Sequence, residues 1–165
     1  MEDQLAETWS IHDRINLYLL DAVAPAALAS VSASKGRTVA EQFAHVHNVR
    51  LMWLGSAAPE LLEGLEKIEK GAATDKDFLA AALTASGRAV EALLRKSLAS
   101  GGRVKGFKPH AAAFLGYLIS HESHHRGQIV LTLKQAGAPG GQEDGVRDLG
   151  VGGTVRDARA CMPGL

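Results

Sequence analysis

The run from His121 to Gln128 contains three histidines within five residues, at positions 121, 124 and 125. Four residues of α-helix turn through about 400°, so His121 and His125 lie one above the other on the same face. Two imidazoles at this spacing are suited to bind one metal ion together. His124 is rotated from them by about 60° and about 100°, so we expect it not to join them. The run therefore predicts a pair of metal ligands.

A zinc-like site needs at least a third protein ligand, and His45 and His47 are the candidates. They lie two residues apart, about 200° around a helix, so only one of them can face the pair. They flank the apolar sector around Val46 and Trp53 almost symmetrically. The other histidine would then be an ordinary hydrogen-bonded residue of the core or its rim. Spacing alone leaves the choice open.

The same run also matches the His-Glu-x-x-His pattern of zinc proteases, in which Glu122 would be the general base. That five-residue pattern is short, and those enzymes need a further ligand downstream. Glu143 is the carboxylate at a suitable distance, but it lies in a glycine-rich segment. No strand is predicted that would bind an extended peptide. A zinc protease is therefore a less favoured hypothesis.

Apolar residues that recur at three- and four-residue steps predict the helices that must position these side chains. Long helices are expected over residues 4–30, 39–56, 75–99 and 109–136, and a short one over 60–70. Thr38-Val-Ala-Glu41 is a capping box at the start of the second helix. The histidine pair falls on the inward stripe of the last helix. We infer an all-α fold, an antiparallel four-helix bundle.

The composition indicates one domain with a distinct C-terminal extension. The chain has 165 residues, of which 46% are apolar and 5% aromatic, a mix that favours packed helices over a sheet. Residues 1–137 are predicted to form the bundle. Residues 138–165 are rich in glycine and lack apolar periodicity, which predicts an extension that is poorly ordered or docked on the bundle or a partner chain.

Charge and cysteine content exclude several classes of protein. Lys and Arg total 18, as do Asp and Glu, so nothing points to nucleic acid as a partner. No apolar run approaches the ~20 residues of a membrane span, and the N-terminus is acidic where a signal peptide would be basic. The single cysteine, Cys161, rules out an internal disulfide and fits a reducing compartment. We expect a cytoplasmic protein that binds no membrane.

Two segments resemble the DinB-like superfamily (DinB/YfiT-like), which includes thiol-dependent S-transferases and mycothiol-dependent maleylpyruvate isomerases. One is the run His-x-x-x-His-Arg-Gly-Gln that begins at His121, and the other is Ala-Glu-Gln-Phe-Ala-His-Val, which ends at Val46. In that superfamily a histidine of the second helix joins two from the last helix. The resemblance therefore implies His45, rather than His47, as the third ligand beside His121 and His125.

The resemblance also implies a divalent metal ion (nickel, zinc or iron) and a homodimer. A three-imidazole site leaves open positions, where the ion lowers the pKa of bound water or thiol or polarises a carbonyl. We expect a metal-dependent hydrolase, or a thiol S-transferase that uses a low-molecular-weight thiol, acting on a small-molecule substrate. The alternative is a non-catalytic, stress-related bundle that binds a metal or a small molecule. A solvent-accessible pocket at the ion would favour catalysis, and a fourth protein ligand would argue against it.

Three residues after the pair have predicted supporting roles. Arg126 is expected to form a buried salt bridge or a dimer contact, or to hold a carboxylate substrate. Gly127 is expected to let another helix approach closely, because it lacks a side chain. Gln128 is expected to orient a ligand histidine.

Overall fold

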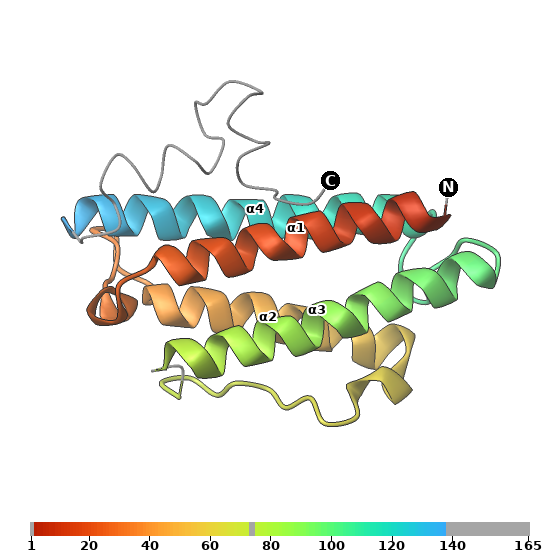
Figure 1. The fold of residues 1–165 in the computed structure, drawn as a ribbon, viewed down its shortest axis with the longest axis horizontal. Coiled ribbons are helices and arrows are strands. Elements are labelled where there is room, and N and C mark those ends of the chain that lie inside the picture. Colours follow the sequence, from red (N-terminus) through yellow and green to blue (C-terminus); the bar gives the residue numbers. More distant parts are fainter. Residues whose placement is uncertain (1, 73–74, 138–165) are drawn as a thin grey trace, which may run out of the picture.

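The computed structural model describes residues 2–72 and 75–137 of the chain. Its main elements are four long helices (Figure 1). They are α1 (Glu2–Ala22), α2 (Val39–Ala57), α3 (Lys76–Ala99) and α4 (Ala111–Gln135), with two short 3-10 helices, η1 (Pro25–Ala29) and η2 (Pro59–Leu62). The predicted all-α four-helix fold is confirmed. The predicted extension over 138–165 lies outside the described residues. None of these helices is long and apolar enough to cross a membrane.

Side-chain caps fix the starts of three helices. The predicted capping box is present: the Thr38 hydroxyl accepts from the Glu41 N–H at 3.0 Å, and the Glu41 carboxylate accepts from the Thr38 N–H at 2.9 Å. Asp75 caps α3 with its carboxylate, and His110 caps α4 with its ring nitrogen Nδ1. These caps satisfy N–H groups that have no partner within a helix.

Two of the predicted helix ranges are wrong. The first helix ends at Ala22 instead of reaching residue 30, because Pro25 has no N–H to donate and instead opens η1. The helix predicted over 60–70 is reduced to η2. Gly64 has a φ of 72°, the left-handed conformation that ends a helix and that glycine adopts without strain. Residues 63–72 form what we call the crossover segment, which runs back along the bundle towards the end where α3 begins (Figure 1).

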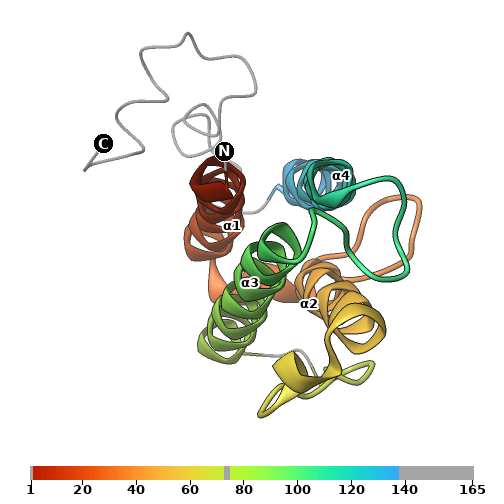
Figure 2. The same cartoon turned by 90° about the vertical axis from the view of Figure 1, so that its right-hand side faces the viewer.

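The crossover segment decides the direction of the helices. Because it returns along the bundle, α2 and α3 point the same way, and α1 and α4 point the opposite way (Figure 1). Helix α3 packs mainly against α1 and α2, whereas α4 contacts α1 and α2 on the other side (Figure 2). The antiparallel neighbours are therefore α1 with α3 and α2 with α4. The pair α2 and α4 carries the predicted metal ligands.

Two apolar clusters fill the bundle, and each draws side chains from all four long helices. The first includes Leu19, Phe43, Leu83 and Ile129, and the second includes Trp9, Leu54, Val90 and Phe114. Between them lies a layer of polar side chains, which we call the polar layer. It consists of His12, Asp13, Asn16, Arg50, Ser86 and Glu122.

The centre of the polar layer is an ion pair between Arg50 of α2 and Glu122 of α4. Nε and Nη2 of Arg50 each donate to a different oxygen of Glu122 at 2.8 Å, and the two side chains are 0% and 1% exposed. His12 and Asn16 of α1 add contacts to the same carboxylate at 2.8 and 2.6 Å. A buried charge must be paired or it opposes folding, so this bidentate pair fixes how α2 and α4 lie against each other.

Candidate metal centre

His45, His121 and His125 come together where α2 faces α4, in what we call the three-histidine cluster. One ligand atom from each residue lies within 4.8 Å of the other two. The His125 ring centroid is 4.6 Å from both the His45 and the His121 centroids. His125 is buried, and the other two are partly exposed. Within the described residues, no fourth His, Cys, Asp or Glu belongs to this cluster.

His47, the other candidate on α2, has a structural role. Its Nδ1 lies 3.0 Å from the carbonyl oxygen of Ala82, and its Nε2 lies 2.9 Å from that of Glu66. Each ring nitrogen therefore faces a carbonyl oxygen, to one of which the neutral ring donates its N–H, and neither nitrogen faces the three-histidine cluster. His47 ties the crossover segment to α2 and α3. Helix periodicity did not separate the two histidines, because the partners of His47 lie on other parts of the chain.

Gln42 is the residue that orients a ligand candidate. The Nδ1–H of His125 donates to Oε1 of Gln42 at 2.7 Å, which leaves Nε2 as the lone-pair nitrogen. This role was predicted for Gln128, and that prediction is wrong, because Gln128 contacts His124 at 2.9 Å on the outer side of α4. Gln42 precedes His45 by three residues and so lies on the same helical face. That spacing is the sequence signal for its role.

The distance between two of the imidazoles fits a metal ion. Nε2 of His121 lies 3.2 Å from Nε2 of His125. Two nitrogens bound to one tetrahedral ion at about 2.0–2.1 Å are about 3.3 Å apart, so the pair already has the spacing of two ligands. Nδ1 of His121 is buried and has no hydrogen-bond partner. A buried polar atom without a partner is uncommon, but the nitrogen at ligand spacing is Nε2, so this atom does not itself mark the position of an ion.

The protonation states also suit a metal. Burial lowers the pKa of His125 to about 4, and the nearby His45, His121 and His124 contribute in the same direction. Burial likewise lowers the pKa of His45, with the charge of Arg37 as the next cause, and burial lowers the pKa of His121. At neutral pH the three rings are therefore uncharged, the form in which histidine binds a metal.

Glu122 is not placed to act as the base of a zinc protease. Burial alone would raise its pKa, but the Arg50 guanidinium outweighs burial, and with His12 it holds the pKa of Glu122 at about 2. Its two oxygens are occupied by Arg50, His12 and Asn16. A carboxylate in this state neither faces a substrate nor accepts a proton at neutral pH. Glu143, the downstream ligand that hypothesis needs, lies outside the described residues.

The predictions for Arg126 and Gly127 are corrected in part. Arg126 donates to Asn16 at 2.7 Å and to Ser123 at 2.6 Å, and it forms no salt bridge within the described residues. Its predicted dimer contact stays a prediction. Among the described residues, a Cβ added at Gly127 would meet no atom within 4 Å, so none of the described helices approaches closely there.

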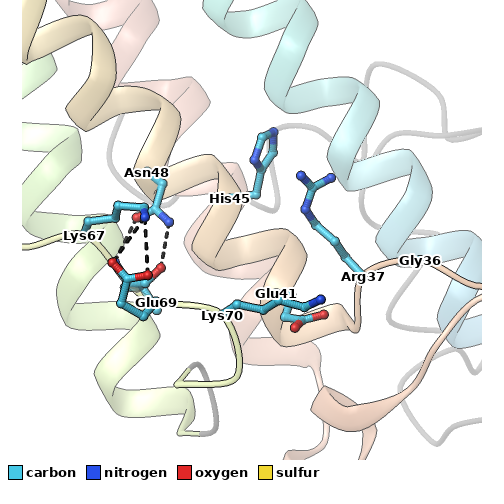
Figure 3. Close-up of a pocket in the computed structure, with 9 residues that line it drawn as sticks. Gly36, Arg37, Glu41, His45, Asn48, Lys67, Glu69 and Lys70 are labelled. Carbon is cyan, nitrogen blue, oxygen red and sulfur yellow. Dashed lines mark hydrogen bonds and ion pairs between the residues drawn. The ribbon is translucent and has the colours of Figure 1, made fainter.

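An open pocket of about 530 Å³ borders the three-histidine cluster on the His45 side (Figure 3). It lies between the start of α2 and the crossover segment. The lining residues are Gly36, Arg37, Glu41, His45, Asn48, Lys67, Ile68, Glu69 and Lys70. Asn48 holds the crossover segment in place, because its side-chain amide forms two hydrogen bonds with the backbone of Ile68, at 2.8 and 2.9 Å. The pocket therefore has a fixed wall.

We predict that Gln42→Leu lowers the affinity for a divalent metal about 10- to 100-fold, because His125 loses the acceptor that orients its ring. A competition titration against a chromophoric chelator measures this change. Gln42→Glu keeps an acceptor and is expected to retain most of the affinity. Gln128→Leu is the matched control on the outer side of α4. Equal affinities for Gln42→Leu and Gln128→Leu would contradict the role given to Gln42.

Comparisons with known proteins agree with this architecture. The model of the DinB family matches residues 1–152. Among solved structures, the chain is similar to the crystal structure of a DinB-like protein from Bacillus cereus ATCC 10987, with a TM-score of 0.58 and 21% sequence identity. The match covers 82% of this chain and 93% of that chain. At this identity the likeness shows a common fold. The search of curated protein sequences found no match.

Proposed function

The chain belongs to the DinB family, and on this premise we propose that it is a metal-dependent enzyme. His45, His121 and His125 would hold a divalent ion. With that ion the enzyme activates a low-molecular-weight thiol or water against a small-molecule substrate. One observation supports the proposal above the others: the ligand atoms lie within 4.8 Å of one another, and His45 borders an open pocket. A bound ion would supply Lewis-acid chemistry, lowering the pKa of a thiol or of water.

The residues of the chain have distinct tasks in this proposal. The three uncharged imidazoles supply the lone pairs, and Gln42 holds the His125 ring by accepting its Nδ1 proton. The ion pair between Arg50 and Glu122 keeps α2 and α4 in the register that brings His45 to the other two. The pocket admits the substrate from the His45 side.

The number of ligands favours an enzyme over a non-catalytic metal protein. Structural zinc sites are closed by four protein ligands, whereas catalytic sites have three and keep one position for water or substrate. The cluster has three candidate ligands within the described residues, and an open pocket adjoins it. Both features support the catalytic alternative.

Thiol transfer is the first candidate reaction, and hydrolysis is the second. The two carboxylates of the pocket have local partners, because one oxygen of Glu41 accepts the Thr38 N–H and Glu69 pairs with Lys67. Little general-base help is therefore available beside the cluster. A thiol has a pKa of about 8.5 and water one of about 15.7, so a thiol needs less help to ionise. This difference favours an S-transferase.

The test is turnover by the metal-loaded protein with a panel of thiols and an electrophile such as 1-chloro-2,4-dinitrobenzene, and with a panel of esters. We expect turnover with at least one thiol, its loss on chelation, and its return when the metal is restored. His45→Ala should be inactive under the same conditions. Activity that survives chelation or persists in His45→Ala would refute the proposed site, and turnover of esters alone would establish the hydrolase instead.

A further inference from the structure

The pocket beside His45 contains charged side chains of both signs. Three of them are cations and two are carboxylates. They are Arg37, Lys67, Lys70, Glu41 and Glu69. At neutral pH the pocket therefore has an excess of one positive charge, and a divalent ion at the uncharged histidines would add two more. This net positive charge attracts anions, and the concave shape of the pocket concentrates its electric field.

The carboxylates of the pocket are used locally. Glu69 accepts from Lys67 at 3.1 and 3.3 Å through its two oxygens, so these two charges compensate each other. Glu41 accepts the Thr38 N–H, which directs one of its oxygens to the start of α2. Neither of the remaining cations has a carboxylate partner assigned to it by these contacts.

Arg37 and Lys70 are those remaining cations. Within the residues that the structure describes, neither forms a hydrogen bond or an ion pair, and both are exposed. Arg37 directly precedes the N-cap of α2, and its side chain extends along the same side of the pocket as the ring of His45 (Figure 3). Its charge contributes to the lowered pKa of both His45 and His125, which is consistent with a guanidinium close to the cluster.

We propose that the substrate carries an oxyanion group, a carboxylate or a phosphate, which Arg37 binds with help from Lys70 while the reacting part of the molecule lies at His45. This inference rests on the proposed function and narrows its substrate class. The planar guanidinium presents two parallel N–H donors that match two oxygens of one oxyanion group. Lys70, a flexible point charge on the opposite wall, adds attraction without fixing orientation.

The test uses two thiols that differ only in this group. The cobalt(II)-loaded protein is titrated with 3-mercaptopropionate and with its neutral amide, 3-mercaptopropionamide, and binding is measured by the thiolate-to-cobalt absorption. We expect the wild-type protein to bind the acid at least about 10-fold more tightly, the effect of a hydrogen bond to a charged group. In Arg37→Gln this ratio should fall at least about 5-fold. Lys105→Gln removes the same charge from the α3–α4 loop, and it should leave the ratio unchanged.

The outcomes test the oxyanion site and the proposed metal site separately. Equal affinities for acid and amide in the wild type, or a ratio that Arg37→Gln does not change, would overturn the oxyanion site. The cobalt spectrum itself reports on the histidines, so the metal site is judged separately. If no cobalt binds, the proposed function fails, and the metal-free protein tests the oxyanion site.

In that second experiment the NMR signal of the Arg37 Nε–H is followed in the metal-free protein. Propionate or inorganic phosphate should shift the signal, and propionamide should not. The anion that acts at the lower concentration identifies carboxylate or phosphate as the recognised group. Absence of a shift with both anions would overturn the proposal.

Discussion

His121→Ala is expected to lower the affinity for a divalent metal by more than about 100-fold, which exceeds the effect of losing an orienting partner. His121 supplies one of the two Nε2 atoms that lie 3.2 Å apart, and the part of the chain that the structure describes offers no fourth His, Cys, Asp or Glu to replace it. With only two imidazole ligands, the ion would be coordinated mostly by water and would bind weakly. Metal analysis after gel filtration should find about one ion per wild-type chain and close to none in the variant.

The matched control for this prediction is His124→Ala. His124 lies on the same turns of α4 and is exposed, and its Nε2 contacts Gln128. Its ring lies 5.3 Å from that of His125, but it offers no ligand atom to the cluster. It should retain the metal. His121 is only partly buried, so its removal should leave the helical circular dichroism unchanged. Metal content that is the same in wild type and His121→Ala would exclude the three-histidine cluster as the binding site.

Glu122→Gln is expected to lower the free energy of unfolding by about 3–5 kcal/mol, because it leaves the Arg50 guanidinium buried with reduced compensation. Asp13 lies 2.8 Å from Nη1 of Arg50 and still compensates part of that charge, so the lower end of this range is expected. Urea unfolding of both proteins measures the difference. Glu91→Gln removes a carboxylate from a more exposed pair with Arg95, and it should cost about 0.5 kcal/mol.

The lowered pKa of Glu122 predicts how the free energy of unfolding depends on pH. Its pKa is about 2 in the folded protein and 4.5 ordinarily, so its contribution is complete above about pH 4.5 and is lost as the pH falls towards 2. The difference between wild type and Glu122→Gln should therefore narrow over this range. A difference below 1 kcal/mol at pH 7, or one that does not depend on pH, would show that the pair does not have the role given to it.

The polar layer explains why the metal centre can lie between two helices. Replacing a buried ion pair with apolar side chains is often neutral or stabilising, so Arg50 and Glu122 are not needed for stability as such. Their bidentate contact is satisfied in one register of α2 against α4 only. Glu122 directly follows His121, and Arg50 lies five residues after His45. A slip of one turn would break the ion pair and separate the histidines together, so the pair is suited to position the cluster.

Local features were readable from the sequence alone. The capping box at Thr38 and the apolar periodicity predicted α2, and the four-residue spacing of His121 and His125 predicted that they share a face. These features depend on residues within one or two turns of each other, where helix geometry alone fixes the relation. The all-α class followed from the same periodicity. The prediction of a helix over 60–70 was wrong, because most of this stretch belongs to the crossover segment. There the backbone of Ile68 forms hydrogen bonds with the side chain of Asn48 instead of bonds within a helix.

The tertiary structure decided everything that depends on residues far apart in the sequence. Gln42 and His125 are 83 positions apart, and Arg50 and Glu122 are 72 apart. No local pattern marks such partners, because a buried polar side chain is compatible with many different partners until the helices pack. The packing of α4 against α2 placed His45 in the cluster, while the two nitrogens of His47 face carbonyl groups of α3 and the crossover segment. Periodicity left these two histidines equivalent, since it describes the faces of one helix and not the chain segments that cover them.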